Sequence, residues 1–189
     1  GEKGRQKLLI GETPMSHPHP PPAMSTRRHF MLMTLLAHSS QLLAAPPDTT
    51  GVPSLEGTDL SGQRLRLAGL RGRVVLVFYW STGCSVCRDK MRELRANLTG
   101  WKAQPFTLLG VNMDARQQDF TDYERLVQQT VPATQQFASL WAGAPGFFDS
   151  MGRPEQLPSA CLIDKRGRLV ERYSGRIPPE AWDRIAELL

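Results

Sequence analysis

The run Val74–Trp80, VVLVFYW, is almost continuously apolar and rich in β-branched and aromatic residues. So short an apolar run is typical of a central strand that is covered on both faces of a sheet. Residues 84–97 follow it, with Leu94 and Leu98 one helical turn apart and charged residues between them, which predicts a helix. A buried strand that leads directly into a helix constrains the chain to an α/β layered fold.

Further segments extend this alternation. The sequence predicts strands over residues 64–67, 105–113, 159–164 and 168–173, and helices over residues 118–129 and from Pro179 onward. The turn Lys165-Arg166-Gly167 joins two of these strands as a hairpin, which adds an antiparallel edge. We therefore expect an α/β fold with a central mixed sheet flanked by helices, and a short strand or hairpin extension at its N-terminal side. Residues 130–157, rich in Gly, Pro and Ala, predict no element.

Cys84 and Cys87 stand three apart where the predicted strand passes into the predicted helix. They could be a redox couple, part of a metal site or a structural disulfide. A zinc site needs about four ligands, and Cys161 is the only further cysteine. A structural disulfide of this spacing closes a very small loop and restrains little unfolded-state entropy. The position therefore favours a redox couple.

The helix position gives the two sulfurs different chemistry. Free backbone N–H groups and the positive end of the helix dipole point at Cys84 and favour its thiolate. Its pKa should therefore fall below the ordinary value of about 8.5, and Arg88 one turn later should help. We expect Cys84 to be exposed and to attack a substrate disulfide, and the more sheltered Cys87 to resolve the mixed disulfide.

Histidine is absent after residue 38, since the four histidines are His17, His19, His29 and His38. This excludes a Ser-His-Asp triad, a Cys-His protease pair and His-ligated zinc or copper in the folded part. We predict no metal and no cofactor. The net charge of +5 forms no basic stripe, so we predict no nucleic-acid partner.

The N-terminal residues 1–45 are interpreted as a disordered leader with an export signal that begins at Met24. A basic head, a short apolar run and small residues follow in the order of a signal peptide. The pair Arg27-Arg28 resembles a twin-arginine signal, although an ordinary secretory signal fits almost as well. The alternative is an amphipathic or disordered arm of a cytosolic protein.

Residues 46–58, which begin Pro46-Pro47-Asp48, are interpreted as a linker, and residues 59–189 as the single domain. Export predicts a periplasmic protein, and an uncleaved signal could tether it to the membrane. The apolar run is shorter than the ~20 residues of a spanning helix.

From about Gly51 to Leu189 the chain resembles the thioredoxin fold, in particular the TlpA/ResA-like branch of exported thiol–disulfide oxidoreductases. The resemblance rests on Cys84-Ser85-Val86-Cys87 together with the stretches LAGLRGRVVLVFYWSTGC, LLGVNMD and LPSACLIDKRGRLVERYSG. It implies a Cys84–Cys87 disulfide in the oxidised protein and a cis Pro158 that faces the pair. Pro158 would present the backbone of Leu157 to an extended substrate segment. Trp80 either lines the site or belongs to the core.

The chain departs from the family pattern at several positions. Gly83 replaces a frequent Trp, Arg92 a frequent Pro, Lys90 a frequent acidic residue and Phe78 the buried Asp of thioredoxins proper. The usual carboxylate helpers are therefore missing, and Asp89 or water would have to replace them.

The resemblance implies reversible dithiol–disulfide exchange with protein substrates, as a reductant, for example for apocytochrome c or another metalloprotein. An exported reductant needs a membrane electron donor, and we expect a monomer. The competing function is a binding module without enzymatic activity, in which the disulfide is structural.

Two related classes lack their motifs here. A peroxidase of this fold needs Pro-x-x-x-Thr-x-x-Cys, but Thr82 stands only two before Cys84. A copper chaperone of the Sco type needs a wider cysteine spacing and a histidine in the domain. Cys161 is interpreted as a small buried hydrophobic residue.

Overall fold

A computed structural model describes residues 52–189 of the chain. The predicted leader and export signal, residues 1–45, lie outside these described residues. So do residues 46–51 of the predicted linker.

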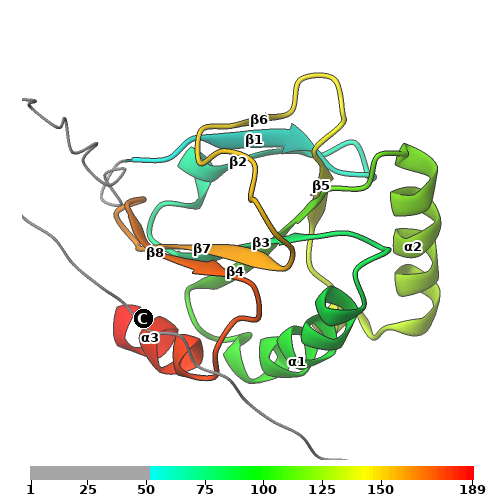
Figure 1. Ribbon diagram of the computed structural model, residues 1–189. Coiled ribbons are helices and arrows are strands. Elements are labelled where there is room, and N and C mark those ends of the chain that lie inside the picture. The colour runs from blue at the N-terminus through cyan, green and yellow to red at the C-terminus, as the bar shows by residue number, and fades with distance from the viewer. Residues whose placement is uncertain (1–51) are drawn as a thin grey trace, which may run out of the picture. The chain divides into compact units, whose positions relative to one another are not determined.

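A five-stranded sheet with the order β5-β4-β3-β7-β8 forms the centre of the domain (Figure 1). Strand β4 runs parallel to both β3 and β5, whereas β7 runs antiparallel to both β3 and β8. The strands are β3 (Val74–Trp80), β4 (Phe106–Asn112), β5 (Ser139–Trp141), β7 (Ser159–Ile163) and β8 (Leu169–Ser174). This arrangement confirms the predicted mixed sheet, and its central strand has the predicted bounds.

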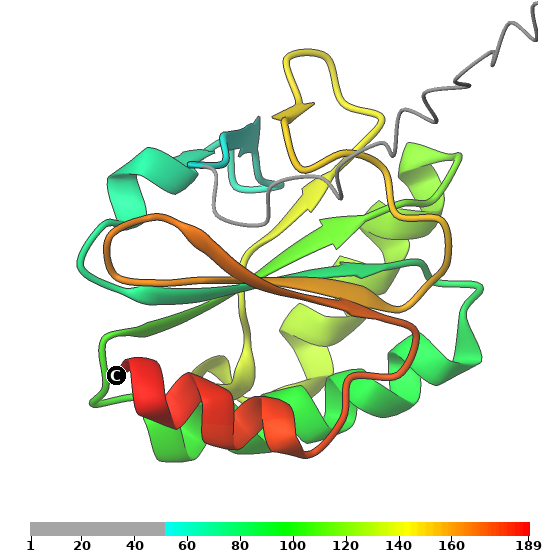
Figure 2. The ribbon, with the colours of Figure 1, turned by 60° about the vertical axis from the view of Figure 1, so that its left-hand side comes forward.

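Helices α1 (Ser85–Trp101) and α3 (Glu180–Leu188) pack on one face of this sheet, and α2 (Gln117–Thr130) stands beside its β5 edge, with Phe120 in the hydrophobic cluster of that face (Figures 1 and 2). Every residue of β3 is buried, and its side chains alternate between two hydrophobic clusters. Phe78 and Trp80 join the helix side, whereas Val77 and Tyr79 join the opposite side. The continuous apolar run of β3 therefore follows from coverage on both faces.

A second sheet covers the opposite face, with the order β2-β1-β6 (Figure 1). Its strands are β1 (Leu55–Thr58), β2 (Arg64–Arg66) and β6 (Phe148–Asp149), and a 3-10 helix, η1 (Leu67–Leu70), follows β2. The carboxylate of Asp59 accepts hydrogen bonds from the backbone N–H groups of Ser61 and Gln63, which closes the β1–β2 turn. The pairing confirms the predicted N-terminal hairpin extension.

The prediction that residues 46–58 form a linker is wrong for their last four residues. Strand β1 occupies them, and Leu55 is 1% exposed within the core. A methyl group on Gly57 would lie 3.2 Å from the Leu140 side chain, so the strand packs closely on the central sheet. The alternation of only four residues beside several glycines and prolines gave too weak a strand pattern.

Two other differences come from tertiary contacts. Helix α1 continues to Trp101, whose ring packs 5.5 Å from Phe106 and 6.0 Å from Trp182. Residues 130–157 contain η2 (Ala133–Gln135), β5 and β6, whose strands are three and two residues long. Such short strands form because a neighbouring strand is present, and they leave little periodic pattern.

In the described part of the chain, no helix has the length and apolar character that crossing a membrane requires.

Candidate active site

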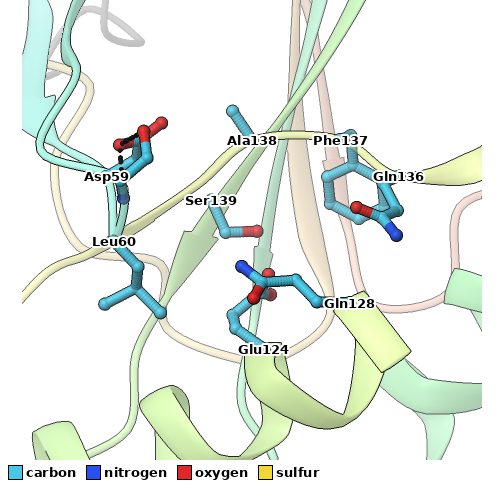
Figure 3. A pocket seen from close by; sticks show the side chains of 9 residues that line it. Asp59, Leu60, Glu124, Gln128, Gln136, Phe137, Ala138 and Ser139 are labelled. Atoms are coloured by element: carbon cyan, nitrogen blue, oxygen red, sulfur yellow. Dashed lines mark hydrogen bonds between the residues drawn. The ribbon is translucent and has the colours of Figure 1, made fainter. Parts of the chain in front are cut away.

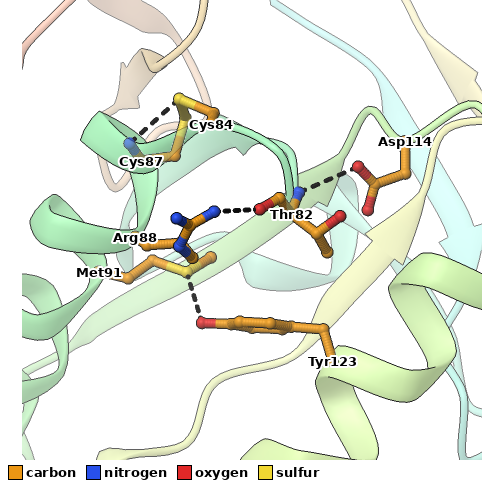
Figure 4. The surroundings of a disulfide bond; sticks show 7 residues. All are labelled: Thr82, Cys84, Cys87, Arg88, Met91, Asp114 and Tyr123. Carbon is orange, nitrogen blue, oxygen red and sulfur yellow. Dashed lines mark hydrogen bonds between the residues drawn. A yellow bond between two sulfur atoms is a disulfide. The ribbon is translucent and has the colours of Figure 1, made fainter.

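A disulfide joins Cys84 and Cys87, with 5.2 Å between their Cα atoms (Figure 4). The pair lies where β3 ends and α1 begins, as the strand–helix pattern predicted. The sulfurs therefore lie at the carboxyl end of the central strand, and the helix holds the two cysteines one turn apart.

The two sulfurs differ in access to solvent and in hydrogen bonding. Cys84 is half-buried, whereas Cys87 is 0% exposed. Cys84 is also the N-cap residue of α1, and its Sγ accepts a hydrogen bond of 3.1 Å from the backbone N–H of Cys87. An N-terminal N–H group of the helix is thus directed at the more accessible sulfur, where negative charge is stabilised.

The loop before the pair is held from two sides at Thr82 (Figure 4). Its backbone N–H donates a 3.0 Å hydrogen bond to the carboxylate of Asp114, and its carbonyl oxygen accepts one from the Arg88 guanidinium. Arg88 therefore closes the loop onto the first turn of α1. Asp114 is itself held by Asn112, whose side-chain amide donates to it at 2.8 Å.

Pro158 is preceded by a cis peptide bond, as the resemblance implied. It comes directly before β7, whose first residue Ser159 pairs with Tyr79 near the end of β3. Because β7 is antiparallel to β3, the first residue of β7 lies beside the last residues of β3, at the same end of the two strands. Leu157 is half-buried and packs against both hydrophobic clusters. The predicted proline thus lies at the same edge as the cysteine pair.

The sequence of this domain matches a model of the AhpC/TSA family over residues 49–180. The chain belongs to the AhpC/TSA family.

Curated relatives of this AhpC/TSA protein bear the name thiol-disulfide oxidoreductase ResA. The protein from Bacillus cereus is 24% identical over 123 residues, 65% of this chain and 67% of the relative. The protein from Halalkalibacterium halodurans is 26% identical over 132 residues, 69% of this chain and 70% of the relative. The predicted resemblance to TlpA/ResA-like proteins and the predicted class of enzyme, the thiol–disulfide oxidoreductases, are confirmed.

Solved structures share the fold. A thiol:disulfide interchange protein of the thioredoxin family from Chlorobium tepidum superposes with a TM-score of 0.57 at 19% identity, over 76% of this chain and 97% of that chain. A DsbF homologue from Corynebacterium diphtheriae gives a TM-score of 0.56 at 16% identity, over 73% of this chain and 85% of that chain. These likenesses confirm the predicted thioredoxin-like fold.

Trp80 is the residue for which the sequence left two alternatives open, a site-lining residue that positions substrate or a core residue. The side chain is 0% exposed and packs against α2, 4.9 Å from the Tyr123 ring and 6.3 Å from the Phe120 ring. Because both partners come from α2, the alternative of a core residue is the one that the structure supports.

Lys90, which stands where the family often has an acidic residue, forms an ion pair with Glu93 in this AhpC/TSA protein. Lys90 is 4% exposed, and its Nζ lies 2.7 Å from the Glu93 carboxylate, which also accepts a 2.8 Å hydrogen bond from Trp182. Burial raises the pKa of Glu93, but the hydrogen bonds from Lys90 and Trp182 together with the Lys90 and Arg176 charges outweigh it, so the pKa is lowered overall. Asp89 is exposed and pairs with Arg92, so its carboxylate is turned to solvent.

Cys161 belongs to the hydrophobic cluster on the opposite face of the sheet from Cys87. Burial raises its pKa to about 11, although the Arg172 guanidinium opposes this. The thiol is therefore protonated at neutral pH and is no part of the candidate site. In residues 52–189, no three His, Cys, Asp or Glu side chains gather as a metal site would require.

Asp114 and Asn112 are the residues of this site that the sequence analysis missed. Asn112 is the buried last residue of β4, and Asp114 stands two residues after it; β4 lies beside β3 in parallel. The carboxyl ends of neighbouring parallel strands meet at one edge of a sheet, so polar residues after β4 reach the loop after β3. That topological signal was present in the stretch LLGVNMD but was used only for the resemblance.

Proposed function

We propose that this protein is an exported thiol–disulfide oxidoreductase that reduces disulfides of protein substrates, with Cys84 as the attacking residue and Cys87 as the resolving residue. The observation that carries the proposal is the unequal access to the two bonded sulfurs. Cys84 is half-buried and capped by the helix N-terminus, whereas Cys87 is fully buried. A substrate sulfur can approach the first but not the second.

The exchange proceeds in two steps that balance in protons and electrons. The Cys84 thiolate attacks one sulfur of a substrate disulfide, and the other substrate sulfur leaves and takes up a proton. The Cys87 thiol then loses its proton and attacks Cys84 Sγ, so that the mixed disulfide breaks and the second substrate thiol is released. The substrate gains two electrons, and the enzyme is left with the Cys84–Cys87 disulfide.

The helix cap favours the first step. The Cys87 N–H that donates to Cys84 Sγ stabilises a negative sulfur more than a neutral thiol. The same stabilisation makes Cys84 a good leaving group when Cys87 attacks it. One backbone group thus assists both halves of the exchange.

Substrate positioning falls to Leu157 and Pro158. They come directly before β7, at the end of the sheet where the cysteine pair lies. There the backbone polar groups of Leu157 can form hydrogen bonds with an extended peptide. An extended peptide bound through its backbone brings a cysteine to the site without demanding one sequence. Exposed Val86, between the two cysteines, adds an apolar contact surface.

The direction of electron flow and the location are proposed by analogy with the TlpA/ResA-like branch that the chain resembles. A periplasmic reductant, acting for example on apocytochrome c or other metalloprotein thiols, receives its electrons from a membrane donor. The signal-like residues from Met24 onward support export.

Substitution of each cysteine tests the proposed chemistry. Cys84→Ser should abolish insulin reduction by dithiothreitol-recharged protein. Cys87→Ser should arrest the reaction as a mixed disulfide that is visible on a non-reducing gel. Cys161→Ser is the matched control and should retain full activity. If the Cys84→Ser protein still turns insulin over, the assignment is wrong and the disulfide is structural.

The reduction potential tests the direction. Titration of the Cys84–Cys87 couple against glutathione should give a value near the thioredoxin end of the scale, about −270 mV. A value near about −120 mV would make the protein an oxidant instead.

A further inference from the structure

A pocket of about 260 Å³ lies between α2, the segment that enters β5 and the β1–β2 turn (Figure 3). We call it the Glu124 pocket. Its lining is Asp59, Leu60, Ser61, Glu124, Gln128, Gln136, Phe137, Ala138 and Ser139. None of these residues takes part in the cysteine chemistry described above.

Two oxygen atoms in this pocket are buried without a partner other than each other. The Ser139 hydroxyl acts on the Glu124 carboxylate, but within residues 52–189 neither the Oε1 of Glu124 nor the Oγ of Ser139 has a further hydrogen-bond partner, and Ser139 is only 4% exposed. Figure 3 shows both side chains turned into the same space. If the serine hydroxyl rotated toward the carboxylate, one donor would still leave most acceptor sites of the two groups empty. Such unpaired buried groups are costly and call for a donor from outside.

The charge of the lining selects the kind of donor. Two carboxylates, Asp59 and Glu124, line the pocket, and no basic residue does. Arg95 lies near but its guanidinium donates to the Gln135 carbonyl and stacks 4.6 Å over the Phe137 ring. The carboxylate of Asp59 already caps the β1–β2 turn. The Arg95 charge favours the ionised form of Glu124, but its guanidinium is engaged by Gln135 and Phe137, so Glu124 is the negative group of the pocket that an outside donor can reach.

We propose that the Glu124 pocket binds a primary alkylammonium group, either of a small amine or of a lysine side chain. Its three N–H donors match Glu124 Oε1, Ser139 Oγ and the side-chain oxygen of Gln128, while Leu60 and Phe137 contact the alkyl part. A quaternary ammonium has no N–H to donate, and a neutral alcohol lacks the charge.

Titration with n-butylammonium chloride at pH 8, followed by amide chemical shifts of ¹⁵N-labelled protein, tests this site. Burial raises the pKa of Glu124 to about 7, so the carboxylate is ionised at that pH. We expect saturable shifts at Ser139 and Gln128, and none with butan-1-ol or tetramethylammonium. Saturable binding of either control compound at similar affinity would overturn the proposal.

Glu124→Gln should weaken butylammonium binding at least about tenfold, because it removes a charge-assisted hydrogen bond. Asp122→Asn is the matched control on the exposed side of the same helix and should bind as the natural protein does. Leu60→Trp, at a 40% exposed turn position, should fill the pocket and abolish binding without disturbing the core. Unchanged affinity for butylammonium in Glu124→Gln would refute the site. If Glu124→Gln fails to fold, unchanged affinity in Leu60→Trp would refute it.

A parallel titration with N-acetyl-lysine amide identifies the source of the ammonium group. Binding comparable to that of butylammonium assigns the pocket to lysine side chains of a partner, and much weaker binding assigns it to free amines. Absence of binding by both compounds overturns the proposal. Insulin reduction should be unchanged in Glu124→Gln, so failure of this site and failure of the proposed redox function are separate results.

Discussion

The carboxylate of Asp114 accepts a hydrogen bond of 3.0 Å from the backbone N–H of Thr82, which stands two residues before the first cysteine of the pair. This contact ties the loop that carries the sulfurs to the end of the neighbouring strand. Asn112 and the Trp141 indole, whose Nε1 donates to the Asp114 carbonyl at 2.8 Å, hold Asp114 in turn. Asp114 is thus a positioning residue for Cys84, although it does not touch the sulfur in this arrangement.

Asp114→Ala should slow insulin reduction by about three- to tenfold, because the loop before Cys84 loses its anchor. It should also lower the free energy of unfolding by about 1–2 kcal/mol. Asp114→Asn keeps one oxygen for the Thr82 N–H but places an amide NH2 group where the carboxylate accepts from Asn112, so it should restore only part of the rate. Asp183→Ala, at an exposed position of α3, is the control. Equal rates for the alanine and natural proteins would contradict the positioning role.

The N-cap hydrogen bond predicts the titration of Cys84 in the reduced protein. The iodoacetamide reaction rate of the Cys87→Ser variant, measured against pH, should show a midpoint below the ordinary thiol value of about 8.5. The Cys87 N–H remains in that variant, so the stabilising donor is preserved. A midpoint at or above the ordinary value would show that the helix terminus does not stabilise the thiolate.

Cys161 should resist alkylation as long as the protein is folded. Burial raises its pKa to about 11, and only about one thiol in a thousand is then ionised at pH 8. Mass spectrometry of the reduced protein after brief iodoacetamide treatment should find Cys84 labelled and Cys161 unlabelled. All three cysteines should be labelled in urea. Rapid labelling of Cys161 under native conditions would contradict its assignment to the core.

The Lys90–Glu93 pair should respond unequally to removal of its two members. Glu93→Ala leaves a Lys90 ammonium that is 4% exposed without its partner, and should cost about 2 kcal/mol of folding free energy. Lys90→Met removes the buried charge and leaves Glu93 half-exposed to water, so it should cost less than about 1 kcal/mol. Urea unfolding of both variants measures this asymmetry, and the reverse order would contradict it.

The raised pKa of Glu124 predicts a decrease in stability as the pH rises. Its pKa is about 7 in the folded protein against an ordinary value of 4.5, so the folded state retains the proton longer. Burial is the cause, while the Arg95 charge and the Ser139 hydroxyl oppose it. Between pH 4.5 and 7 the free energy of unfolding should therefore fall, by on the order of 3 kcal/mol from this group.

Urea unfolding at pH 5 and pH 8 measures this decrease, and Glu124→Gln isolates it. The variant keeps the pH dependence of other groups, including Asp149, whose pKa burial also raises. The difference between the natural protein and the variant should grow from pH 5 to pH 8 in favour of the variant. A constant difference would show that Glu124 titrates normally.

Local patterns were sufficient to predict the central strand and the cysteine pair. The apolar run of β3 and the C-x-x-C spacing both lie within one short segment, so no distant contact is needed to read them. Whether Trp80 lines the site or belongs to the core depends on α2, because the Tyr123 and Phe120 rings of that helix pack against Trp80. No pattern near residue 80 contains that information.

The residues missed by the sequence analysis depend on contacts between separate elements. Asp114 reaches Thr82 only because β4 lies beside β3, and Glu124 faces Ser139 only because α2 packs beside β5. Ser139 also lies in the stretch 130–157, where strands of two or three residues leave no readable period. Sequence predicts such contacts only after the order of strands in the sheet is known.

Strand β8 forms one outer margin of the central sheet, and its middle residues are Glu171 and Arg172. A second molecule that aligned its own strand there would have to bring charged side chains together and strip water from them. The β8 edge therefore disfavours pairing with a strand of a second molecule.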